Sequence, residues 1–122
     1  MVRPPLILIG YWATEPADGW PSPASFVDTS WDTGEREVVT EYLRRGFVSR
    51  AYMGYSPCRL CGRDNGCLEL SDGIYVWPDG LAHYVSEHAV RLPPVFVEHV
   101  LSMIDMLETS SRDQSWWRQI GH

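Results

Sequence analysis

The segment 58-CRLCGRDNGCLELSDGIYVWPDGLAHYVSEH-88 holds a cysteine pair, then a predicted hairpin, then a predicted helix with two histidines. Cys58 and Cys61 stand three positions apart, and Gly62 follows directly. In a tight Cys-x-x-Cys turn the backbone N–H groups point at the sulfurs, and the glycine lets the chain leave without a Cβ clash. The pattern is typical of a zinc knuckle, which supplies two of the four ligands of a structural zinc site.

His83 and His88 are the candidates for the other two ligands, in an H-x4-H spacing. A hairpin followed by a helix with two histidines is the order of a two-Cys, two-His zinc finger. Here 21 residues separate Cys61 from His83, where such fingers have about twelve. The hairpin must therefore be longer, or the zinc fold is a different one. We predict a structural Zn²⁺ on Cys58, Cys61, His83 and His88.

Helix geometry places a condition on this ligand set. On a regular helix, side chains five positions apart project about 140° from one another. His83 and His88 can bind one ion only if the helix tightens or ends before His88. Pro93 favours an early end, because the residue before a proline disfavours helix.

Three other interpretations of the cysteines remain open. In the first, Cys67 replaces one of the histidines. In the second, Cys58 and Cys61 form a redox pair, although no helix clearly begins at Cys58 to lower its thiol pKa. In the third, the thiols are reduced and metal-free, and the histidines belong to the core. His99 and His122 stand apart from all of these interpretations.

The rest of the chain supplies further strands. The apolar run 6-LILIGYW-12 predicts a strand covered on both faces. Residues 47–56 predict a second strand, and 68–77 predict a hairpin that turns at Asp72-Gly73. Residues 13–27 carry three prolines and no period, and we expect an ordered loop there, packed by Trp20 and Phe26.

Three helices are expected beside these strands. The first begins at Asp32 as N-cap, with Glu35 as its capping-box partner, and stops at Gly46. The others cover residues 81–88 and about 95–107. Together the elements predict an α+β fold with a small antiparallel sheet, a hairpin, a zinc knuckle and three helices. We expect one domain over residues 1–122, with its core at about 47–92 and the C-terminal helix at about 95–108.

Composition excludes several classes of function. The chain has 122 residues and a net charge of −6, which disfavours a nucleic-acid partner because phosphate binding needs basic clusters. No apolar run approaches the roughly 20 residues that cross a bilayer, and the N-terminus lacks a signal-peptide core. We therefore expect a cytoplasmic protein, in which thiols stay reduced.

The predicted C-terminal helix has an unusually wide apolar surface. On a helical wheel over 95–109 the polar side chains form a narrow stripe, and apolar side chains occupy more than half of the circumference. Either the tail with Trp116 and Trp117 covers this surface, or a second chain does. We predict a protein partner or a homo-oligomer through the helix from Val95 to Leu107, and no membrane partner.

An enzymatic alternative rests on Glu87. If only three residues bind zinc, the open position can hold a water, and Glu87 can act as its base. The spacing H-x3-E-H is one residue longer than the inverted zincin motif H-x-x-E-H. We therefore favour a structural zinc site over a zinc-dependent hydrolase.

Residues 58–93 also resemble a known family. The cysteine pair, the run YVWPDGLAHYV at 75–85, His88 and Leu92-Pro93 resemble a family of small, uncharacterised bacterial proteins expected to bind zinc. The resemblance implies a common fold and a common metal site, and it brings no activity.

Overall fold

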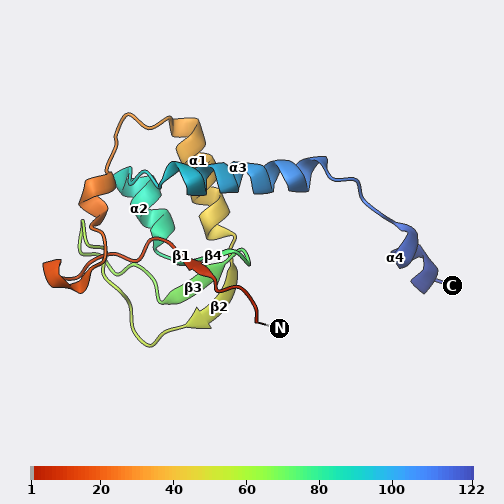
Figure 1. The fold of residues 1–122 in the computed structure, drawn as a ribbon, viewed down its shortest axis with the longest axis horizontal. Coiled ribbons are helices and arrows are strands. Elements are labelled where there is room, and N and C mark those ends of the chain that lie inside the picture. The colour runs from red at the N-terminus through yellow and green to blue at the C-terminus, as the bar shows by residue number, and fades with distance from the viewer. Residues whose placement is uncertain (1) are drawn as a thin grey trace. The chain divides into compact units, whose positions relative to one another are not determined.

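The computed structural model describes residues 2–122 and shows the predicted α+β class. Two compact units are distinguished within the single domain expected from the sequence; one ends at Leu92 and the other is Pro93–His122. The first unit holds the sheet and two helices, α1 and α2, which lie side by side over the sheet in Figure 1. Its elements are β1 (Ile7–Leu8), η1 (Pro16–Asp18), η2 (Pro23–Phe26), α1 (Thr33–Arg44), β2 (Phe47–Ala51), β3 (Leu68–Ser71), β4 (Tyr75–Pro78) and α2 (Leu81–His88).

The sheet has four strands in the order β1-β4-β3-β2. The hairpin predicted at 68–77 is present as β3 and β4, and Leu70 pairs with Trp77 in antiparallel register. Its turn is held by Asp72, whose Oδ1 accepts hydrogen bonds from Ile74 N at 2.9 Å and Tyr75 N at 2.8 Å. β2 is antiparallel to β3, but β1 is parallel to β4. The sheet is therefore mixed, where the sequence predicted an antiparallel one.

The N-terminal strand differs most from its prediction. Only Ile7 and Leu8 form a strand, and both are about half exposed, at 51% and 52%. β1 is an edge strand, and Gly10, with φ +81°, turns the chain away two residues later. The prediction that this strand is buried on both faces was therefore wrong. A continuous apolar run does not distinguish a strand covered on both faces from an edge strand with one face open.

α1 begins at its predicted N-cap and ends at Arg44, two residues before Gly46. The Asp32 side chain accepts a hydrogen bond from Glu35 N at 2.9 Å. The Glu35 carboxylate does not complete the predicted capping box, because it accepts the indole N–H of buried Trp31 at 2.5 Å. At the other end of α1, the Leu43 carbonyl accepts from Trp77 Nε1 at 3.0 Å. Trp77 is fully buried, so this bond anchors the helix to the centre of the sheet.

The second unit contains two helices, α3 (Pro94–Thr109) and α4 (Ser115–Ile120). Four α-helices are thus present in the described chain, one more than predicted. α4 has only six residues, too few for an apolar period to show in the sequence. Among the helices of residues 2–122, none is long and apolar enough to cross a lipid bilayer.

Candidate metal centre

The turn at Cys58 and Cys61 has the backbone geometry of a knuckle. Gly62 N donates to Cys58 O at 2.8 Å, and Cys58 N donates to Arg63 O at 2.8 Å. Leu60 N points at Cys58 Sγ, 3.4 Å away. Gly62 adopts φ +75°, a conformation that glycine takes without a steric cost. In this turn a backbone N–H group points at a cysteine sulfur, and the chain continues through Gly62 in a conformation that suits glycine.

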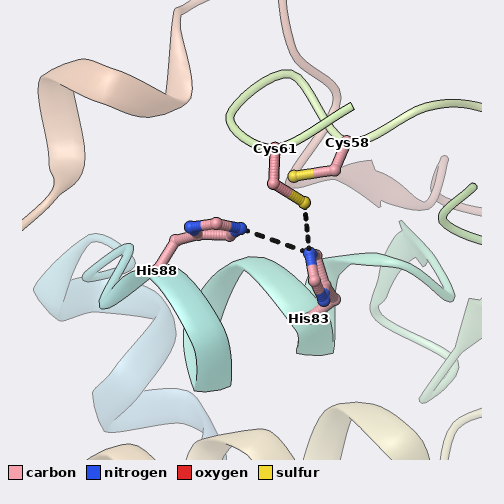
Figure 2. Close-up of side chains that lie close together, drawn as sticks. All are labelled: Cys58, Cys61, His83 and His88. Carbon is pink, nitrogen blue, oxygen red and sulfur yellow. Dashed lines mark hydrogen bonds between the residues drawn. The ribbon is translucent and has the colours of Figure 1, made fainter. Parts of the chain in front are cut away.

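The two histidines come from α2, which begins directly after the hairpin. Trp77 is fully buried in β4, and the chain continues through Pro78 to Gly80, the N-cap residue of α2. Leu81 and Val85, both fully buried, form the core face of the helix. His83 and His88 are half-buried, on the side that faces the knuckle (Figure 2).

Regular helix geometry predicted that His83 and His88 can meet only if α2 tightens or ends before His88. The helix does neither. His88 is its last residue, and Ala89 follows in the left-handed conformation with φ 51°. Ala89 N donates to Tyr84 O, five residues earlier, so the last turn is wider than an α-helical turn. A wider turn rotates the chain less per residue, and this brings His83 and His88 closer to one face.

The four predicted ligands lie together. One donor atom from each of Cys58, Cys61, His83 and His88 lies within 4.8 Å of the other three. Cys61 Sγ is 3.4 Å from His83 Nε2, and the Nε2 atoms of His83 and His88 are 3.2 Å apart. Figure 2 shows the cysteines reaching from the loop and the histidines from α2 toward a common point.

Two of the six donor–donor separations are close to those of a small tetrahedral metal ion. With metal–nitrogen bonds near 2.0–2.1 Å and metal–sulfur bonds near 2.3 Å, a tetrahedron places two nitrogens about 3.3 Å apart and a nitrogen about 3.6 Å from a sulfur. The observed 3.2 Å and 3.4 Å lie within about 0.2 Å of these values. The four donors therefore could hold a metal ion, and these two separations fit a four-coordinate one.

The environment favours the metal-binding protonation states. Burial raises the pKa of the Cys58 thiol, but hydrogen bonds from Leu60 N and Cys61 N outweigh burial and bring that pKa below its ordinary value. Burial lowers the pKa of His83, and the neighbouring charge of His88 lowers it further. Metal ligands must be thiolates and neutral imidazoles, so both shifts favour binding.

Several residues hold the knuckle against the hairpin and α2. Tyr84, on α2, accepts a hydrogen bond at its hydroxyl from Arg59 N at 2.7 Å. Asn65 Nδ2 donates to Gly80 O at 3.1 Å. A Cβ on Gly80 would lie 2.1 Å from Asn65 O, so only glycine allows this close approach. The sequence does not predict these three roles, because a contact between distant segments leaves no local period or motif.

The other candidate residues lie outside the cluster. The backbone carbonyl of Cys67 accepts from Tyr52 N at 2.7 Å, and Cys67 is among the residues that line a neighbouring cleft. Glu87 is exposed on α2. His99 lies on α3 with its ring 6.1 Å from that of Phe96, and His122 is exposed at the chain end.

No family model, no curated protein and no solved structure matches this chain. The resemblance carried by residues 58–93 therefore stays a prediction.

Proposed function

We propose that this is a cytoplasmic protein with a structural zinc site, which acts through contacts with other proteins. The observation that carries the metal assignment is the convergence of four donor atoms from Cys58, Cys61, His83 and His88 within 4.8 Å. Two thiolates and two imidazoles in a tetrahedron are a donor set that zinc prefers.

The chemistry of the cluster supports a bound cation. The Nε2 atoms of His83 and His88 face each other at 3.2 Å. Only one proton fits between them, so at least one of the two nitrogens presents a lone pair to the site. Two sulfurs add further electron-rich donors to the same space. A divalent cation at the centre satisfies all four groups at once.

A structural role is supported by the count of protein ligands. Catalytic zinc keeps a position open for water, whereas structural zinc is closed by four protein ligands. Four donors are available here, and Glu87 is exposed. This favours the structural site over the hydrolase with Glu87 as base.

A role in protein contacts is supported by the second unit. Of the apolar side chains on α3, Val95, Leu101, Met106 and Leu107 are exposed at 66%, 42%, 47% and 57%. These side chains project to several sides of the helix, so apolar surface is open on more than one side of α3, and large exposed apolar areas are common at interaction surfaces. We propose a partner protein or a second copy as the group that covers them.

Metal analysis tests the zinc assignment. Protein purified without added metal should contain about one zinc per chain, because a filled structural site survives purification. Elemental analysis gives the stoichiometry, and a thiol reagent counts the accessible cysteines in the native protein. Absence of metal, together with free titration of Cys58 and Cys61, would contradict the proposal.

A further inference from the structure

A groove lined by aromatic side chains lies beside the metal centre. Its main part is a cleft of about 440 Å³. A second cleft, of about 380 Å³, shares Tyr11 and Tyr52 with the first. We call the two clefts together the aromatic groove. The first cleft is lined by six aromatic residues: Tyr11, Trp12, Trp20, Tyr52, Tyr55 and Tyr84.

Three of these rings are open to solvent. Trp20, Tyr52 and Tyr55 are exposed at 51%, 50% and 65%. The sequence predicts that Trp20 packs the loop at 13–27; in the structure its ring centroid lies 6.4 Å from that of Tyr11 at the groove. Tyrosine and tryptophan are enriched at binding surfaces, because each combines a large apolar face with a polar tip.

A buried carboxylate fixes the rings in the middle of the groove. Glu69 is only 8% exposed, and its carboxylate accepts from Tyr52 OH at 2.7 Å and Ser49 Oγ at 3.0 Å. Burial, and then the charge of Glu69, raises the pKa of the Tyr11 hydroxyl, so Tyr11 lies near the same carboxylate. Because Tyr52 lines both clefts, its bond to Glu69 preorganises the surface where the clefts meet.

The polar groups of the first cleft are largely engaged within the chain. Asn65 donates to Gly80 O, Asp79 Oδ1 accepts from Leu68 N, and Arg59 donates to Ser56 Oγ. Two buried donors of residues that line this cleft, Trp12 Nε1 and Arg59 Nε, have no hydrogen-bond partner among the described residues. A sugar needs many free donors and acceptors, whereas two donors suit a ligand that presents apolar faces and a few carbonyl acceptors.

The charged residues that line the two clefts do not favour an ionic ligand either. The two clefts contain two acidic residues, Asp79 and Glu69, and two basic residues, Arg50 and Arg59. This balance gives an organic cation or anion no net attraction. A proline-rich chain fits best, because proline lacks the N–H donor, has an apolar ring and forms an extended helix before binding.

We propose that the aromatic groove binds a proline-rich segment of a partner protein in the polyproline II conformation. Grooves lined by aromatic side chains recognise such segments because the ligand loses little entropy on binding. The groove contains neither the metal ligands nor the apolar side chains of α3, so this inference goes beyond the proposed function.

Titration with a synthetic peptide tests the inference. The probe is N-acetyl-decaproline amide, added to the full-length, metal-loaded protein, and the readout is the NMR shift of the tryptophan indole N–H groups. We expect saturable shifts that include Trp20. Replacement of Trp20 or Tyr55 by Ala should weaken binding about tenfold or more, as for aromatic hot spots.

Matched controls separate the groove from other exposed rings. Trp117 is 70% exposed and lies outside the groove, so Trp117→Ala should leave the affinity unchanged. A glycine–serine peptide of equal length should not bind. Equal affinity of Trp20→Ala and wild type, or saturable binding of cellohexaose or choline without binding of decaproline, would overturn the inference.

Discussion

Cys58 and Cys61 belong to one turn but differ in their surroundings. Cys58 is 2% exposed, whereas Cys61 is exposed. The thiol of Cys58 is nevertheless in polar contact, because Leu60 N lies 3.4 Å from its sulfur. Cys58 is therefore a core residue as well as a candidate ligand, and Cys61 is a ligand candidate at the surface.

Substitution of single cysteines separates these roles. Cys58→Ser and Cys61→Ser should each release the metal and lower the free energy of unfolding by several kcal/mol, because the binding energy of a structural zinc, about 10–16 kcal/mol in zinc-finger peptides, is folding energy. Cys67→Ser is the matched control and should keep the metal. Zinc content and the thermal midpoint measure both effects. Loss of metal from the Cys67 variant would place Cys67 in the site instead of a histidine.

The lowered pKa of His83 predicts a pH dependence of the metal-free protein. The ordinary value is 6.5, and burial followed by the charge of His88 lowers it in the folded state. Below pH 6.5 the unfolded chain thus binds more protons than the folded chain, and the free energy of unfolding falls as the pH falls. Urea unfolding of the metal-free protein between pH 7.5 and 5.5 measures this slope.

Variants assign the slope to one residue. His83→Gln should flatten the slope, and His122→Gln, at the chain end, should leave it as in the wild type. An unchanged slope in the His83 variant would contradict the assignment. In the metal-bound protein, acid should also release the ion, because protons compete for the same donor atoms.

At the scale of elements, the site depends on contact between the loop at 56–67 and the turn that begins α2. Gly66 and Gly80 lie at this contact: a Cβ on Gly66 would be 1.9 Å from Asp79 Oδ1, and one on Gly80 would be 2.1 Å from Asn65 O. Gly80 has an ordinary φ of −71°. Its need for glycine therefore comes from packing alone.

Gly80→Ala should separate the loop from α2. We expect a loss of roughly 1–3 kcal/mol in the free energy of unfolding, as for an overpacked site, and weaker zinc binding because the cysteines move away from the histidines. Gly121→Ala is the control, since its φ is −75° and its nearest contact would be 3.6 Å. Equal zinc affinity in both variants would show that the contact does not position the ligands.

The sequence predicted local elements well and long-range contacts poorly. The knuckle, the hairpin, α1 and α2 each have a signal within a few residues: a cysteine spacing, Asp72-Gly73, or the N-cap Asp32. The parallel pairing of β1 with β4 has no such signal, because it joins segments almost 70 residues apart through a contact that no turn specifies. The two short 3-10 helices, η1 and η2, and the helix α4 were not predicted, because each is too short to show a periodic pattern in the sequence.

For the candidate site, too, the local pattern could be predicted from the sequence and the three-dimensional arrangement could not. Spacing alone named the four residues that the structure brings together. Spacing could not show how the histidines converge, because the wider last turn depends on Ala89 in the left-handed conformation. A buried alanine with positive φ carries a strain of order 1–3 kcal/mol, and no sequence rule for helix ends anticipates it.

At the scale of the whole molecule, the second unit carries apolar surface that its own tail leaves open. Phe96, Val97 and Val100, near the start of α3, are buried, whereas Leu101, Met106 and Leu107 are exposed. Trp116 and Trp117 are themselves exposed at 68% and 70%. A tail folded over α3 would bury these rings, so the tail does not cover α3 in this structure. Another chain as the cover stays a proposal.

Association of the intact protein tests this interface. Burial of one large apolar side chain contributes roughly 1.5–3 kcal/mol, so Met106→Glu should raise the dissociation constant at least about tenfold. Val2→Glu is the control, because Val2 is 94% exposed and lies in the first unit, outside the aromatic groove. Light scattering over a concentration series should show wild type and the Val2 variant associating at concentrations where the Met106 variant is monomeric.

Deletion of residues 110–122 should leave the association in place, since the exposed tail does not cover α3. A strict monomer at high concentration that aggregates only after this deletion would show that the tail is the cover, and that α3 is no interface between copies of the chain.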